Sequence, residues 1–203
     1  MNIRYVGDSA LLVEVQDFRA AQRLRESIGR QPPDGIRELL PGYDTLLVEF
    51  DPLQLDAAEL LQRLPEFMQD LRSAAAVHTH EIEVRYQGED LEDVARLTGL
   101  DRAEVIRRHS AANYTVAFLG FAPGFPYLAG LDAKLRVPRL QSPRARVPAG
   151  AVAIADEFSG IYPQATPGGW RILGHTKVVL FDAARASPAL CMPGDHVRFR
   201  PVS

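Results

Sequence analysis

Cysteine is almost absent from this sequence of 203 residues, since Cys191 is its only one. No disulfide can therefore form within the chain, which fits a reducing compartment. The sequence also lacks any apolar run near the ~20 residues of a membrane span. Charged residues occur near the first residues of the sequence, where a secretory signal peptide would have its apolar core. These absences predict a cytoplasmic protein that has no membrane partner.

Neither sign of charge dominates. The sequence has 23 Lys and Arg and 26 Asp and Glu, which gives a formal net charge of −3. The chain therefore has no global basic face, and nucleic acid is not an expected partner. Hydrophobic residues make up 46% of the sequence, which supports a packed core in one large domain or two small ones.

Several catalytic and metal motifs are missing. The sequence has neither the GxxxxGK[ST] phosphate loop nor the GxSxG nucleophile elbow. His78 and His80 lie two residues apart, but no cysteine or acidic cluster accompanies them, so a surface role is favoured and no metal is expected. Cys191 lacks a convincing histidine partner in the local sequence and is typical of a core position or the flank of a turn. An enzymatic activity would therefore need another subunit.

Residues 1–86 follow a regular alternation of strands and helices. The segment Asp17–Arg30 has apolar residues at helical spacing behind a capping aspartate, and Pro65 predicts a kink or break in a second helix that continues through Leu71. The predicted strands are Ile3–Val6, Ala10–Val15, Ile36–Leu40, Thr45–Phe50 and Glu81–Tyr86. The resulting order β-α-β-β-α-β is typical of a ferredoxin-like domain over residues 1–86.

Residues 87–203 follow a different pattern. Two short helices, Asp90–Leu97 and Asp101–His109, come first, and short β-rich runs divided by Pro/Gly turns follow them. The predicted strands are Tyr114–Phe121, Ala151–Ala155, Trp170–Leu173, Lys177–Phe181 and His196–Val202. Many short strands with frequent turns indicate a small barrel or sandwich, so the chain as a whole is of the α+β class.

The segment GFAPGFPYLAG, Gly120 to Gly130, concentrates aromatic residues between prolines and glycines. Pro123 and Pro126 remove two backbone donors and fix φ, which predicts a rigid turn that holds its aromatic side chains in place. The candidate binding residues here are Phe121, Pro123, Phe125 and Tyr127. The pattern leaves open whether the aromatic rings are held for packing or for a ligand.

Polar candidates gather farther along the chain. Arg144 and Arg146 lie two residues apart in a segment with five cations and no acidic residue, and in an extended strand they form a fork suited to carboxylate or phosphate. A solvated basic loop is the alternative. His175 is the best acid–base candidate. The segment SGIYPQATPGGWRILGHT adds Tyr162, Gly168, Gly169 and Trp170, where the paired glycines favour an ordinary hairpin over an oxyanion site.

Five ordered motifs carry a resemblance to a known family: GFAPGFPYLAG, SPRARVPAG, GIYP, TPGGWRILGHT and PGDHVRF. Together with GDSALLVEV and PGYDTLLVEFDP near the start, they resemble the B subunits of the bacterial 5-oxoprolinases, a family also labelled allophanate hydrolase subunit 1 and KipI-type. The resemblance implies an N-terminal ferredoxin-like α/β domain over residues 1–86. It also implies a C-terminal cyclophilin-like β-barrel over residues 87–203, with the two short helices at its start.

The resemblance further implies subunits A and C as partners in an enzyme that opens 5-oxo-L-proline to L-glutamate with ATP, held by the complex and not necessarily by this subunit. Arg144 and Arg146 would then face phosphate or the substrate carboxylate. The resemblance does not say what the aromatic turn contacts. We expect Phe125 and Tyr127 to line the mouth of the barrel or the contact with the C subunit, which is related to the second allophanate-hydrolase-type subunit, and packing in the barrel's own core is the alternative. His175 departs from the family, which commonly has arginine there. Two other functions share these motifs: inhibition of a sensor histidine kinase, and a subunit of an allophanate- or urea-processing enzyme.

Overall fold

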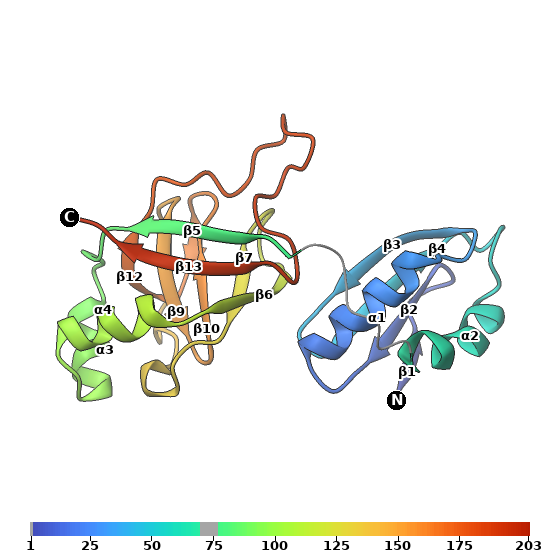
Figure 1. Cartoon of the computed structure of the whole chain (residues 1–203), viewed down its shortest axis with the longest axis horizontal. Helices are drawn as coiled ribbons and strands as arrows, with labels where there is room; N and C mark the ends of the chain where they lie inside the picture. The colour runs from blue at the N-terminus through green and yellow to red at the C-terminus, as the bar shows by residue number, and fades with distance from the viewer. Residues whose placement is uncertain (1, 70–76) are drawn as a thin grey trace. The chain divides into compact units, whose positions relative to one another are not determined.

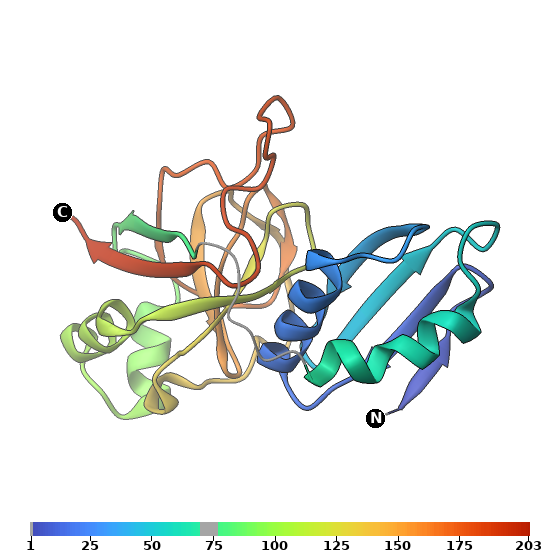
Figure 2. The ribbon, with the colours of Figure 1, turned by 45° about the vertical axis from the view of Figure 1, so that its right-hand side comes forward.

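The computed structural model describes residues 2–69 and 77–203. They fall into two compact units, Met1–Val77 and His78–Ser203, which are described separately (Figures 1 and 2). Of the residues expected in a helix, Leu71 lies outside the described part. No helix within residues 2–69 and 77–203 has the length and apolar character needed to cross a bilayer.

The first unit is a four-stranded antiparallel sheet with two helices. Its strands are β1 (Ile3–Tyr5), β2 (Ala10–Glu14), β3 (Ile36–Pro41) and β4 (Thr45–Phe50), in the order β1-β2-β4-β3. Its helices are α1 (Phe18–Arg30) and α2 (Ala57–Gln69), and Figure 2 shows both over the same face of the sheet. Leu11, Val48, Leu24 and Leu60 belong to the core between these layers.

Local sequence accounts for the start of α1 but not for the continuity of α2. The Asp17 carboxylate caps α1 by accepting the Ala20 N–H at 2.8 Å. Helix α2 runs through Pro65 to Gln69, so the break that the proline predicted does not occur. Proline removes one helical hydrogen bond, and the burial of Leu60 and Leu64 against the sheet offsets that loss.

The last strand expected in the first unit belongs to the second. Strand β5 (Thr79–Val84) pairs in parallel with β13 (His196–Pro201), from Thr79 opposite His196 to Val84 opposite Pro201. The first unit therefore has the order β-β-α-β-β-α, with β1 as its fourth strand, and its boundary lies before His78 instead of after residue 86. Ile82 and Val84 are buried in the core of the second unit. Because this burial is available beside β13, the strand belongs to the sheet of the second unit.

The second unit contains a seven-stranded sheet in the order β12-β9-β10-β7-β6-β13-β5. Its remaining strands are β6 (Tyr114–Leu119), β7 (Pro126–Ala129), β9 (Ala151–Ala155), β10 (Phe158–Ile161) and β12 (Arg171–His175). A single bridge between Arg85 and His175 joins the two end strands, so the sheet is nearly closed into a barrel. Helices α3 (Leu91–Thr98) and α4 (Arg102–Ala111) precede β6, as the sequence predicted.

Two strands lie apart from the barrel sheet, and one expected strand is missing. Strand β8 (Arg144–Val147) pairs with β11 (Thr166–Gly168) in a separate ribbon. Because β11 pairs with β8 while β12 pairs with β9, the hairpin expected around Gly168 and Gly169 does not form. The expected strand Lys177–Phe181 is irregular, except for one bridge between Phe181 and Ala189.

Candidate functional site

The aromatic turn follows β6 and exposes one ring. Phe121 is 61% exposed and has a φ of 65°, a left-handed conformation that is unusual for a large side chain. Its ring makes edge contacts with Phe125 and Tyr162, at 5.4 and 6.1 Å between ring centroids. Pro123 beside it is exposed as well. The turn therefore presents Phe121 and Pro123 to solvent.

The other rings of the turn are packed inside the protein. Phe125 is buried and contacts Tyr162 at 5.1 Å and Trp170 at 5.3 Å, both edge to face. Tyr127, at the start of β7, is half-buried and stacks on Phe118 at 4.3 Å. Edge-to-face and stacked contacts of this kind add to the stabilisation from burial. Phe125 is therefore a core residue. Burial of the neighbouring Tyr162 raises the pKa of its hydroxyl.

The paired glycines differ in their surroundings. A Cβ added at Gly168 would lie 2.4 Å from the Tyr162 Oη, whereas one at Gly169 would have no neighbour closer than 3.6 Å. Gly168 therefore permits β11 to pack directly on Tyr162. Since Gly168 also faces Arg144 in the β8–β11 ladder, the ribbon brings the arginine next to the aromatic cluster.

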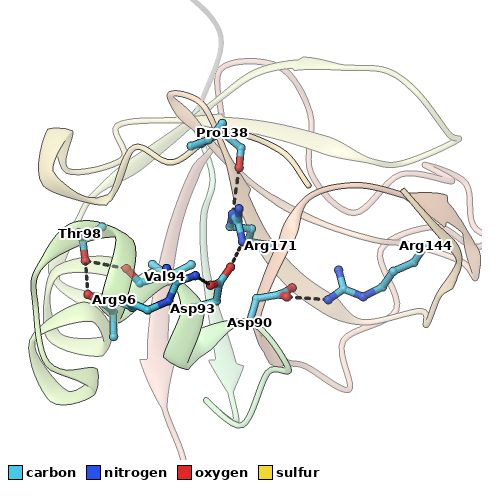
Figure 3. Close-up of polar contacts among 9 residues, drawn as sticks. Asp90, Asp93, Val94, Arg96, Thr98, Pro138, Arg144 and Arg171 are labelled. Carbon is cyan, nitrogen blue, oxygen red and sulfur yellow. Dashed lines mark hydrogen bonds and ion pairs between the residues drawn. The ribbon is translucent and has the colours of Figure 1, made fainter. Parts of the chain in front are cut away.

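Arg144 is held by two carboxylates that sequence reasoning did not single out. Its Nη2 donates to Asp90 Oδ1 at 2.6 Å, and its Nε lies 3.3 Å from Glu89 Oε2. The buried Asp90 carboxylate, drawn with Arg144 in Figure 3, also accepts the Ile172 N–H at 2.7 Å, so it joins β8 to β12. Arg146, in contrast, is exposed and makes no ion pair among the described residues.

A second, partly buried ion pair lies beside the first. Arg171 pairs with Asp93 on α3, and its Nε donates to the Pro138 carbonyl at 3.0 Å (Figure 3). Asp90 and Asp93 lie three residues apart at the start of one helix. This spacing was the only feature of the sequence that could have indicated the two ion pairs. Their arginine partners lie far away along the chain, so local patterns could not identify these pairs.

His175 lies apart from these residues. It ends β12, is half-buried, and lines an open groove of about 770 Å³ together with Glu81, Arg85 and Lys177. No hydrogen bond or ion pair between described residues joins His175 to Arg144 or Arg146, and neither arginine lines the groove. The three residues predicted to be catalytic therefore do not form one constellation within this chain.

A fully buried histidine connects α4 to the barrel. His109 Nδ1 lies 2.7 Å from the Tyr86 hydroxyl, and its Nε2 lies 2.9 Å from Ser159 Oγ. Ser159 Oγ donates to the Ala153 carbonyl at 3.3 Å, so one direction satisfies all three side chains: Tyr86 donates to Nδ1, and Nε2–H donates to Ser159. Burial lowers the pKa of His109 to about 3. The ring is therefore neutral and serves as a structural link.

The Cys191 thiol and the acidic and histidine side chains were considered as a nucleophile and as metal ligands. Cys191 is buried, and that burial, followed by the nearby Asp195 charge, raises its pKa to about 12. Its thiol is therefore a poor nucleophile at neutral pH. Within residues 2–69 and 77–203, no group of three or more His, Cys, Asp or Glu side chains is arranged to hold a metal ion.

The chain resembles curated proteins along nearly its whole length. It is 41% identical to the B subunit of 5-oxoprolinase from Escherichia coli O157:H7 over 97% of this chain and 94% of that protein. Identity to the corresponding Bacillus subtilis protein is 34%, over 100% of this chain and 95% of that protein. The urea amidolyase of Saccharomyces cerevisiae is 27% identical over 98% of this chain, which covers only 13% of that protein.

Solved structures show the same fold. A crystal structure of TTHA0988 matches all of this chain with a TM-score of 0.84 and 39% identity, and this chain spans 40% of it. The urea amidolyase of K. lactis matches 99% of this chain with a TM-score of 0.76 at 23% identity. The family described as carboxyltransferase domain, subdomain C and D, matches residues 1–191. The chain belongs to this family and, within it, to the 5-oxoprolinase B-subunit proteins.

Proposed function

We propose that this chain is the B subunit of an ATP-dependent 5-oxoprolinase, which opens 5-oxo-L-proline to L-glutamate together with subunits A and C. The observation that carries the proposal is the end-to-end match to curated 5-oxoprolinase B-subunit proteins at 34 to 41% identity. The match covers 97 to 100% of this chain, so the likeness is not limited to one shared domain.

The separation of the polar candidates supports a role inside a complex. His175 lies in a groove away from Arg144, and Arg144 is already neutralised by Asp90 and Glu89. Opening a stable lactam needs activation of its carbonyl, which ATP supplies by phosphorylation. A triphosphate needs several free cations, and Arg146 is an exposed guanidinium of the basic segment that makes no ion pair among the described residues. We therefore assign ATP to the complex and not to this chain alone.

Reconstitution tests the proposal directly. The full chain is purified with its two candidate partners, and glutamate release from 5-oxoproline is followed with and without ATP. We expect turnover in the complete mixture only, and background rates when any one of the three proteins or ATP is omitted. A stable three-part complex without glutamate release would refute the proposal.

A second candidate function is urea or allophanate processing, which the match to yeast urea amidolyase over 98% of this chain favours. Its lower identity ranks it after the first. Deleting the gene for this chain separates the two. Loss of growth on urea with normal growth on 5-oxoproline would support the second function.

Arg146→Ala should lower the activity of the assembled complex at least about tenfold, because loss of a charge-assisted hydrogen bond costs roughly 1.5–3 kcal/mol. The melting temperature should stay within about 2 °C, since the side chain is exposed. Arg136→Ala, an exposed cation of the same segment, is the matched control and should keep full activity. Equal activity of both variants would exclude a role for Arg146.

Phe121→Asn should weaken binding of the candidate C-subunit partner about tenfold or more, as loss of an aromatic anchor does at interfaces. Asparagine accepts the left-handed conformation at this position, so the turn should keep its shape and stability. Titration calorimetry measures the affinity. Leu53→Asn, at an exposed apolar position of the first unit, is the control. A loss of affinity equal to that of the control would show that the exposed ring does not contact the partner.

A further inference from the structure

Within residues 2–69, only one face of the four-stranded sheet is covered by helices. Helices α1 and α2 pack on that face, where Leu11, Leu46 and Val48 are buried in the core with them. Figure 2 shows both helices on the same side of the sheet. The opposite side is the outer face of this sheet. It consists of the outward side chains of β2, β3 and β4, among them Leu12, Leu40, Leu47, Glu38 and Glu49.

A row of leucines crosses the outer face. Leu12 pairs with Leu47, and Leu47 pairs with Leu40, so the three side chains lie next to one another on β2, β4 and β3. They point outward because their neighbours along each strand point into the core. Leu40 is 41% exposed, and Leu12 and Leu47 are half-buried. The solvated face of an antiparallel sheet is normally polar, so an apolar row indicates a face that a partner covers.

The charges on the outer face do not balance. Glu38 lies directly opposite Glu49 in the β3–β4 ladder, two positions along the strands from the leucine row. Neither carboxylate makes an ion pair among the described residues. The arginines of β1 and β3 are already engaged in ion pairs at 3.1 Å: Arg4 with Glu14, and Arg37 with Asp51. Like charges directly opposite each other on neighbouring strands are destabilising, so a basic partner would relieve this pair of glutamates.

We propose that the outer face binds an amphipathic helix of a partner polypeptide, with an apolar stripe and with Lys or Arg along one flank of that stripe. Side chains on one stripe of a helix recur about every 5.4 Å, close to the roughly 4.8 Å between neighbouring strands. A helix that lies along the row therefore places one apolar residue beside each leucine. Its basic flank then lies over Glu38 and Glu49. This inference does not depend on the proposed activity.

A second copy of this chain is a poor occupant of the outer face. Two copies can stack their leucine rows about a twofold axis that runs along the strands or across them. The first arrangement places Glu49 against Ala10 of the other copy, and the second places it against Thr45. Neither residue is a cation, and a carboxylate that leaves water without a partner is costly. The charge of the face therefore favours a basic helix over self-association.

A synthetic peptide tests the outer face without any partner protein. The probe is acetyl-Ala-Leu-Lys-Gln-Ala-Leu-Lys-Gln-Leu-Lys-Gln-Ala-Leu-Lys-Ala-amide, whose leucines form one helical stripe and whose lysines lie along one flank of it. It is titrated into the full chain by NMR. We expect saturable binding, with the largest shift changes at Leu12, Leu40 and Leu47. A second peptide, with glutamate in place of every lysine, keeps the stripe and should bind at least about tenfold more weakly.

The double variant Glu38→Gln/Glu49→Gln separates the charges from the leucine row. Its affinity for the lysine peptide should fall about five- to tenfold, because the attraction between the carboxylates and the lysines is lost. Its affinities for the two peptides should therefore lie closer together than those of the unmodified chain. The melting temperature should stay equal or rise, since the like-charge pair is gone, whereas glutamates with a structural role would lower it on removal.

Leu47→Thr removes the centre of the leucine row and keeps a residue that favours strands. The affinity for the lysine peptide should fall at least about tenfold, as it does on loss of a central apolar contact. Leu53→Thr, at a leucine outside the row that is 93% exposed, is the matched control and should bind as the unmodified chain does. Melting temperatures report whether each variant folds, and the pair of peptides tests the unmodified chain in any case.

Three results would overturn the inference. They are no saturable binding at millimolar lysine peptide, equal affinities for the lysine and glutamate peptides, and shift changes confined to residues outside β2, β3 and β4. A concentration-dependent dimer in sedimentation that Leu47→Thr abolishes would instead assign the outer face to a second copy of the chain, against the partner proposed.

Discussion

His109→Ala should lower the free energy of unfolding of the second unit by about 4 kcal/mol, as the sum of a buried cavity and an unpaired hydroxyl. The ring is fully buried, stacks on Phe199 at 4.7 Å, and accepts the Tyr86 hydroxyl. Trp170 is the only tryptophan and lies in the second unit, so its fluorescence during urea unfolding reports this loss. His196→Ala, at an exposed histidine, is the control and should change stability little.

The same histidine should make the second unit sensitive to acid. Burial lowers its pKa from 6.5 to about 3, so below pH 6.5 the unfolded chain binds a proton that the native ring does not. Stability is therefore complete above pH 6.5 and falls with pH until about pH 3, by about 2 kcal/mol on reaching pH 5. His109→Gln does not titrate and should lose this part of the dependence. An unchanged pH profile in the glutamine variant would contradict a neutral buried ring.

Asp90→Asn should destabilise the second unit by about 3 kcal/mol, because it leaves the Arg144 charge without its buried partner. The amide oxygen of asparagine can still accept the Ile172 N–H, so the variant tests the charge and not the backbone contact. Unfolding followed by Trp170 fluorescence measures the effect.

Glu89→Gln is the matched control for that variant, since Glu89 contacts the same arginine from an exposed position. Glu89→Gln should lower the free energy of unfolding by less than about 1 kcal/mol. In the double variant Asp90→Asn/Arg144→Met, part of the lost stability should return, because neither charge then remains. Equal losses from the Asp90 and Glu89 variants would show that burial does not set the strength of the pair.

Local patterns in the sequence were sufficient for most of the secondary structure. The cap at Asp17, the strand Thr45–Phe50 and the two short helices before β6 follow from neighbouring residues alone. The turn at Gly120–Gly130 was likewise located correctly, although its second half, from Pro126, forms β7. The family, too, was identified from ordered motifs, because their order and spacing do not depend on tertiary contacts.

Only the tertiary structure decided which elements and side chains meet. The alternation of Ile82 and Val84 suits either sheet, and the burial available beside β13 determines that β5 joins the barrel. Asp90 meets Arg144, and His109 meets Ser159, across 54 and 50 residues of sequence. No local pattern encodes such pairs, since they form only where folding removes both groups from water and leaves each as the other's partner.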